Sequence, residues 1–205
     1  MPLEPVANRS DTTLVEKAKI GDHVAFEELV TRYQRRVYGL AYRLTSNTAE
    51  AEDVLQEVFL QVYQKINNFR GESAFYSWLY KITLNTTYMR MRKRQRRREE
   101  PIEDALPKFG EDGSFTQMVS KFSLSPETEA LRAEARRLTA AAIDTLAEEY
   151  KTVLILRDIE GLPAAEVGAM LGLSIPAIKS RLHRARLFLR QKLENYFKER
   201  KGRTP

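Results

Sequence analysis

The sequence predicts an all-α protein of two small helical domains joined by a flexible acidic linker. Apolar residues recur at helical spacing along most of its 205 residues, and no segment alternates like a half-buried strand. This pattern breaks over residues 99–125, where prolines and glycines interrupt an acidic stretch that is too long for a loop within one compact domain. We expect an N-terminal tail and first turn over 1–21, a first domain over 22–98, the linker, and a second domain over 126–205.

Three helices are expected in the first domain. Asp22 can cap the first of them, and Asn47, followed by a glutamate three residues later, resembles a capping box that opens the second. A polar loop over 67–73 precedes the third helix, which begins near Ala74 and continues into a run of arginines. Each boundary is predicted by a side chain suited to satisfy the free amide groups at a helix start.

The second domain contains four predicted helices, the first starting at Pro126. The second and third end at Gly161 and Gly172, because glycine tolerates the left-handed conformation that closes many helices. Ser174 can cap the fourth helix, which continues to about Arg200. A short amphipathic helix, a tight turn and a longer basic helix predict a helix-turn-helix at the C-terminal end.

Charge is segregated along the chain. The 34 Lys and Arg exceed the 28 Asp and Glu, which gives a net charge of +6 and a pI near 9.5. Residues 90–98 hold seven basic side chains, residues 99–129 hold eight acidic ones, and residues 179–203 hold ten basic ones. Separate basic blocks indicate an anionic partner such as nucleic acid, rather than a uniformly solvated surface.

Several classes of protein are disfavoured. The absence of cysteine excludes disulfides, thiolate metal sites and thiol nucleophiles, and is typical of a reducing cytosol. No signal peptide and no run of eighteen apolar residues occurs, so we expect a cytoplasmic protein without direct membrane insertion. His23 and His183 are the only histidines, and no glycine-rich phosphate loop is present. We therefore predict no catalytic residues, no metal and no cofactor.

The final helix carries the sharpest functional pattern. An apolar stripe that includes Ile178, Leu182 and Ala185 predicts its buried side. Polar and basic residues in its first three turns lie on the opposite face. In a recognition helix, this is the face that enters the major groove of DNA. The alternative is a basic surface face on an ordinary bundle helix. The candidate DNA-contacting residues are Lys179, Ser180, Arg181, His183 and Arg184.

Aromatic and basic residues are interleaved between Phe69 and Arg98. Aromatic rings offer faces on which unpaired bases stack, while neighbouring cations hold the phosphate backbone. Trp78 shares a helix face with Phe75, Leu79, Ile82 and Met89, which favours a core position for its ring. The candidates for contact with nucleic acid are Arg70, Tyr76, Tyr80, Lys81, Asn85 and Arg92.

Polar groups also gather on the outer face of the second helix. Asp53, Gln56, Glu57 and Gln61 lie there beside the apolar Leu60. A carboxylate cluster could indicate a metal site or an acid–base pair, but no histidine is near in sequence. From the residues alone, a solvated helix face is favoured over either kind of site.

These segments together resemble the extracytoplasmic function (ECF) group of bacterial sigma factors. The segment DVLQEVF from Asp53 resembles the family's polymerase-binding region, and FRGESAFYSWLYKITLN from Phe69 its region for opening and reading the −10 element. The segments GLPAAEV from Gly161 and KSRLHRAR from Lys179 resemble its −35 reader. The likeness covers about residues 22–98 and 126–193, with two separate motifs in the expected order.

The resemblance implies core RNA polymerase, promoter DNA and an anti-sigma protein as partners. It implies that Asp53, Gln56, Glu57 and Leu60 contact the polymerase, and that the linker threads toward the polymerase active centre. It places Lys179, Ser180, His183 and Arg184 at the −35 element. It places Arg70, Tyr76 and Asn85 near the −10 strand.

Two other functions are alternatives to a sigma factor active in a stress or envelope response. A helix-turn-helix transcriptional regulator with a helical sensor domain would explain the C-terminal half. It gives no reason for the aromatic and basic helix or for the acidic linker. A hydrolase or nuclease built on clustered carboxylates is disfavoured because metal-ligand spacing and a nucleophile–base pair are missing from the sequence.

Overall fold

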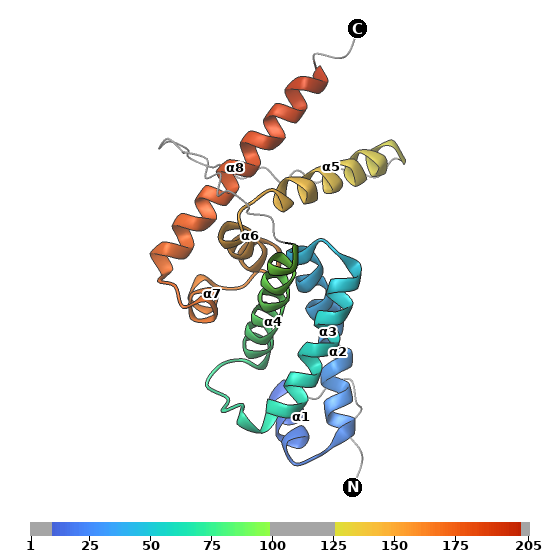
Figure 1. Cartoon of the computed structure of the whole chain (residues 1–205), viewed down its shortest axis with the longest axis vertical. Coiled ribbons are helices and arrows are strands. Elements are labelled where there is room, and N and C mark those ends of the chain that lie inside the picture. Colours follow the sequence, from blue (N-terminus) through green and yellow to red (C-terminus); the bar gives the residue numbers. More distant parts are fainter. Residues whose placement is uncertain (1–9, 99–125, 202–205) are drawn as a thin grey trace. The chain divides into compact units, whose positions relative to one another are not determined.

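The computed structural model describes residues 10–98 and 126–201, and within these ranges it contains helices and no strand. The described helices form two compact units, each of which is considered by itself (Figure 1). The predicted linker over 99–125 and the first nine residues lie outside the described ranges. None of the described helices is both long enough and apolar enough to cross a membrane.

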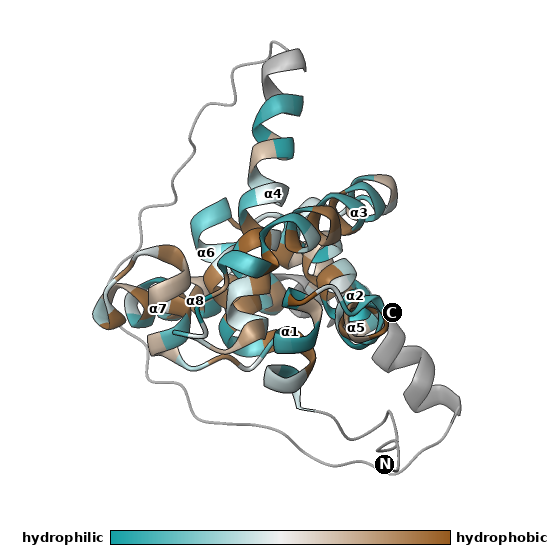
Figure 2. Cartoon of the chain, turned by 90° about the horizontal axis from the view of Figure 1, so that it is seen from below, coloured by the Kyte–Doolittle hydropathy of each residue, from teal (hydrophilic) through white to brown (hydrophobic). Residues whose placement is uncertain are grey.

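The first unit is built around a core shared by α1 to α4. Apolar side chains from each helix meet there, among them the fully buried Leu14, Leu29, Val58 and Leu79. Helix α3 carries both hydrophilic and hydrophobic residues, as is typical of an amphipathic helix packed on a core (Figure 2). The elements are α1 (Asp11–Lys19), α2 (His23–Thr45), α3 (Thr48–Lys65), the 3₁₀ turn η2 (Ile66–Asn68), α4 (Phe75–Arg98) and α7 (Ala164–Leu171).

The predicted helix starts in this unit are confirmed. The Asp22 carboxylate accepts a hydrogen bond of 3.0 Å from the amide of Ala25, three residues into α2. The Asn47 side chain accepts one of 3.0 Å from the amide of Glu50 at the start of α3. Both bonds satisfy amide groups that a helix start leaves without an intrahelical partner.

Helix α1 was not expected, because residues 1–21 were predicted to be a tail and first turn. Ser10 caps this helix by accepting a hydrogen bond of 3.2 Å from the amide of Thr13. Its Leu14 and Val15 are buried against the core. At nine residues, α1 is too short to be recognised from periodicity, and it gains its stability from tertiary packing.

The second unit comprises α5 (Pro126–Asp144), α6 (Glu148–Leu154), the π-helical turn η3 (Ile155–Ile159) and α8 (Ile175–Lys201). Its buried apolar residues include Val153 and Ile155 together with the predicted stripe of Ile178, Leu182 and Ala185 on α8. The sequence predicted one helix over 148–160. Instead the last turn widens, because the amide of Glu160 donates to the carbonyl of Ile155, five residues earlier.

The two predicted glycine terminators both adopt the left-handed conformation. Gly161 has φ +72° after η3, and Gly172 has φ +67° at the end of α7. Gly168, within α7, is required for a steric reason that the sequence pattern did not predict. The amide of Leu173 donates to its carbonyl at 2.9 Å, and a Cβ at Gly168 would lie 2.7 Å from the Leu173 carbonyl oxygen. The tight turn between α7 and α8 therefore requires glycine at this position.

Helix α7 lies within the predicted second domain over 126–205, but in the structure it does not belong to the second unit. It belongs to the same compact unit as α1 to α4, while the rest of the described part of 126–205 forms the second unit. Glu166 of α7 accepts hydrogen bonds from the hydroxyls of Tyr76 (2.5 Å) and Ser77 (3.0 Å) on α4. Contacts between residues about ninety positions apart cannot be anticipated from local sequence pattern.

Candidate nucleic-acid and polymerase interfaces

The first three turns of α8 present a continuous polar and cationic face. Lys179, Ser180, His183 and Arg184 are all exposed, and they lie away from the buried stripe of Ile178, Leu182 and Ala185. No ion pair engages Lys179 or Arg184 within residues 10–98 and 126–201. Such donors at the start of a recognition helix suit hydrogen bonding to base edges and phosphates in the major groove.

Arg181, also predicted to contact DNA, forms an ion pair within the protein. Its guanidinium lies 2.9 Å from the Glu149 carboxylate in the first turn of α6. Arg186 forms a bidentate pair with Asp158 of η3, with N–O distances of 2.8 and 2.6 Å. This hydrogen bonding to Asp158 raises the pKa of the Arg186 guanidinium. Two arginines of the basic block therefore hold α8 against α6 and η3, and so orient its exposed face.

An exposed stripe also runs along α4. Lys81, Asn85 and Arg92 are exposed and follow one another at helical spacing. Arg70, in the loop before α4, is exposed as well, 3.9 Å from the Glu72 carboxylate. This arrangement is suited to binding single-stranded DNA. The side-chain amide of Asn85 can form a hydrogen bond with a base edge, while the neighbouring cations bind the phosphate backbone.

Tyr80 does not belong to this exposed stripe. Its side chain is only 2% exposed, and its ring packs against that of Tyr76 at 6.3 Å. Tyr76 is half-buried, and its hydroxyl donates to Glu166. In this arrangement Tyr80 offers no ring face to a base, because the face of α4 on which it lies is covered. This differs from the predicted DNA-contacting role of Tyr80.

The expected core position of Trp78 agrees with the structure, whereas that of Met89 was wrong. The Trp78 ring packs 5.2 Å from Phe69 and 6.0 Å from Phe75, against the core of the first unit. Met89 is 69% exposed. Thr86 and Thr87, in the turn just before it, are buried, so the buried side of α4 at this level is turned away from Met89. Met89 instead lies between Asn85 and Arg92 on the exposed stripe.

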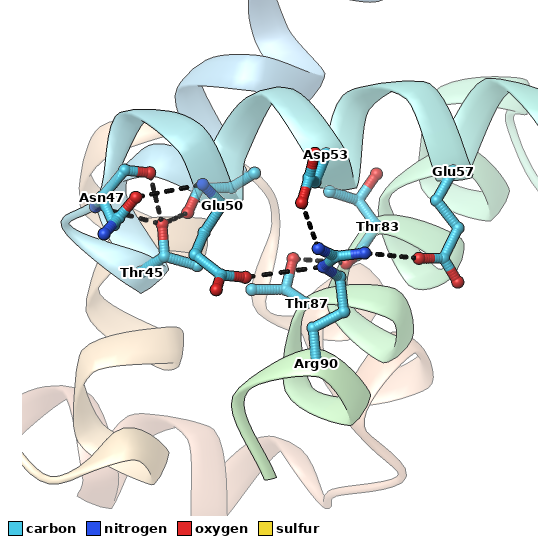
Figure 3. Close-up of polar contacts among 9 residues, drawn as sticks. Thr45, Asn47, Glu50, Asp53, Glu57, Thr83, Thr87 and Arg90 are labelled. Carbon is cyan, nitrogen blue, oxygen red and sulfur yellow. Dashed lines mark hydrogen bonds and ion pairs between the residues drawn. The ribbon is translucent and has the colours of Figure 1, made fainter. Parts of the chain in front are cut away.

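The outer face of α3 presents the predicted polar group. Asp53 and Gln56 are exposed, and Leu60 is 58% exposed although it is apolar. The structure adds a partner that the sequence did not indicate. The guanidinium of Arg90, on α4, pairs with the carboxylates of Asp53 and Glu57 (Figure 3). A cation from the chain itself therefore lies among the carboxylates that had raised the possibility of a metal or acid–base site.

An exposed cationic face on the first turns of α8, together with a second one along α4, is typical of a DNA-binding protein. Family models match the chain in both halves: Sigma-70 region 2 over residues 29–97, and Sigma-70 region 4 over residues 136–189. The ECF RNA polymerase sigma-E factor of Haemophilus influenzae is 37% identical over 188 residues, which cover 90% of this chain and 96% of that protein.

Two further relatives agree. The RNA polymerase sigma-H factor of Pseudomonas aeruginosa is 35% identical over 196 residues, which cover 95% of this chain and 99% of that protein. The solved structure of the sigma factor RpoE in complex with the anti-sigma factor NepR from Bartonella quintana matches with a TM-score of 0.61 and 25% identity. That match covers 82% of this chain and 96% of the solved one. The chain belongs to the ECF group of RNA polymerase sigma factors, and it is a transcription initiation factor rather than an enzyme.

Proposed function

We propose that this chain directs core RNA polymerase to promoters through two separate DNA-reading faces and one polymerase-binding face. The observation that carries the proposal is the exposed run of Lys179, Ser180, His183 and Arg184 on the first turns of α8, which we assign to the −35 element. This assignment treats residues 126–205 as the −35-reading domain and residues 22–98 as the domain that binds the −10 element and the polymerase.

The −10 element is assigned to the exposed side of α4 and the loop before it. Arg70, Lys81, Asn85 and Arg92 are accessible there, whereas Tyr76 is half-buried and its hydroxyl donates to Glu166. We assign Asp53, Gln56, Glu57 and Leu60 of α3 to polymerase binding, because exposed carboxylates beside an exposed leucine offer both charge and apolar contact. The linker over 99–125 would enter the basic channel of the polymerase, where its acidic residues imitate nucleic acid.

An anti-sigma protein is the further partner that we propose. The solved relative from Bartonella quintana is described as a complex with an anti-sigma factor, and the sigma-E relatives belong to the ECF group. Such a partner would keep the chain inactive until a stress or envelope signal releases it. Because its target is the polymerase, the chain would act in the cytoplasm.

Run-off transcription tests this function directly. Core polymerase together with this protein is expected to initiate from a double-stranded promoter, and neither component is expected to do so alone. The isolated protein should bind the same promoter weakly, because each domain carries only a modest reading surface. Tight, sequence-specific binding by the isolated chain without any effect on polymerase would instead indicate an ordinary DNA-binding regulator.

Charge reversal on α3 tests the polymerase face. Asp53→Lys, or Gln56→Ala combined with Glu57→Ala, should weaken binding of the full-length protein to core polymerase by about threefold to tenfold. Glu52→Lys is the matched control, since Glu52 is an exposed carboxylate one position away on the same helix. Unchanged association in a pull-down, with circular dichroism showing an intact fold, would mean that this face is merely solvated. An equal loss with Glu52→Lys would indicate a general charge effect.

A further inference from the structure

Arg90 connects the two functional helices of the first unit. It extends from α4, where the basic end of that helix begins, and its guanidinium faces three carboxylates of α3 (Figure 3). Nε lies 3.5 Å from Glu50 Oε2, and Nη1 lies 3.2 Å from Glu57 Oε2. The remaining nitrogen, Nη2, pairs with Asp53 Oδ2. Each nitrogen of one guanidinium therefore binds a different carboxylate.

The spacing along α3 explains why a single arginine can serve three acids. Residues 50, 53 and 57 are separated by three and four positions, which places them on neighbouring turns of one helix face. Without a cation between them, three negative charges so close together would repel one another and turn apart. A lysine could not substitute fully, because its ammonium is a compact charge without the planar fork of three nitrogens.

The guanidinium is well held in this position. Partial burial lowers the pKa of Arg90, but the hydrogen bond to Glu57 and the charges of Asp53 and Glu50 outweigh that effect and raise the pKa above its usual value. The nearby α3–α4 interface adds one weaker polar link, a hydrogen bond of 3.1 Å from Gln61 Nε2 to Thr86 Oγ1.

The carboxylates are held by Arg90 but remain accessible. The side chains of Asp53 and Glu57 are 56% and 39% exposed, and Arg90 contacts only one oxygen of each. The three acids and the arginine together leave two net negative charges on this face. A partner that approaches from solvent would therefore meet acidic groups whose rotamers are already restricted, and it would lose less conformational entropy on binding.

We propose that Arg90 is a positioning residue for polymerase binding, which acts through Asp53 and Glu57 by holding their carboxylates in the orientation that the polymerase contacts. This inference rests on the proposed polymerase-binding role of α3. The opposite hypothesis is that Arg90 competes with cations of the polymerase for the same carboxylates. The two hypotheses predict opposite signs, because removing a competitor would strengthen binding whereas removing a positioning residue weakens it.

Equilibrium binding of the full-length protein to core polymerase tests this sign. Arg90→Ala should weaken binding about fivefold even though it makes the face more acidic, and Arg90→Lys should lie between this variant and the wild type. In a background of Asp53→Asn with Glu57→Gln, Arg90→Ala should have no further effect, because the groups through which it acts no longer carry charge. Tighter binding by Arg90→Ala, or an undiminished loss in that background, would overturn the proposal.

Arg32 supplies a matched control for stability. It also bridges two carboxylates of the first unit, at 2.5 Å from Asp11 and 2.9 Å from Glu28, and its side chain is 32% exposed compared with 31% for Arg90. Arg32→Ala should lower thermal stability to a similar extent while leaving affinity for the polymerase unchanged. An equal loss of affinity in both variants would mean that the Arg90 effect is only structural.

The outcomes separate this inference from the function on which it rests. If Asp53→Lys weakens polymerase binding but Arg90→Ala does not, Arg90 has no positioning role and α3 remains the polymerase face. If neither variant changes binding, the assignment of α3 itself is wrong.

Discussion

Gly168→Ala should destabilise the turn between α7 and α8 and weaken recognition of the −35 element. A methyl group at this position would lie 2.7 Å from the carbonyl oxygen of Leu173, which is backbone and cannot rotate away. Helix propensity favours alanine over glycine by about 0.5–1 kcal/mol, whereas a forced steric contact in a packed region costs about 1–3 kcal/mol. The steric term is larger, so the net effect is a loss of stability.

Gly39→Ala is the matched comparison, since Gly39 also lies within a helix. A methyl group there would meet only the end of the Arg43 side chain, at 3.1 Å, and that flexible chain can move aside. This variant should be neutral or slightly stabilising, while Gly168→Ala unfolds at lower urea concentration by circular dichroism. Faster hydrogen exchange at the Leu173 amide, which donates to Gly168, would locate the damage at the turn. Equal stability of the two variants would contradict the steric argument.

Arg184→Ala should remove discrimination at one base position of the −35 element. Arg184 is exposed on the face of α8 that carries Ser180, where a guanidinium can form two parallel hydrogen bonds with a guanine edge. Losing that pair should cost about 1–3 kcal/mol for promoters with the preferred base. Promoters already altered at that base should lose much less affinity, because the contact is absent in them.

The measurement compares promoter variants bound by polymerase with the full-length protein at two salt concentrations. Arg190→Ala and Lys192→Ala serve as controls, since Arg190 pairs with Glu194 at 2.7 Å and the Lys192 ammonium lies 5.7 Å from the Phe188 ring. Each control should weaken binding evenly across sequences and flatten the salt dependence, or change nothing. If Arg184→Ala weakens binding equally for every −35 variant, this arginine contacts phosphate and the assumed orientation of α8 is wrong.

The local signals in the sequence were the most informative about the fold. Asp22, Asn47, Gly161 and Gly172 were each identified from residue type and position, and each has the predicted role. Caps and left-handed terminators involve residues within a few positions of one another, so the sequence contains all that is needed to recognise them. Helix α1 was not predicted because the contacts that stabilise it are made with residues far away in the sequence. Asp11 pairs with Arg32 and accepts a hydrogen bond from the Tyr33 hydroxyl, both on α2.

The exposure of side chains was predicted correctly on α8 but not at every position of α4. Periodicity correctly separated the exposed side of α8 from its buried stripe, because that helix has one apolar face. On α4 the same reasoning failed at Tyr80, which is buried, and at Met89, which is exposed. A helical wheel describes the helix alone and carries no information about where neighbouring helices begin and end.

By itself the sequence determined the all-helical class, most helix boundaries and the cationic face of α8, since these depend on spacing and on hydrogen bonds between near neighbours. Only the tertiary structure decided which charges are already paired. Arg181 meets Glu149, and Arg90 meets three carboxylates that precede it by 33 to 40 residues. Attraction between charges depends on their separation in space, which the packing of α4 on α3 and of α8 on α6 sets and which no local pattern of residues encodes.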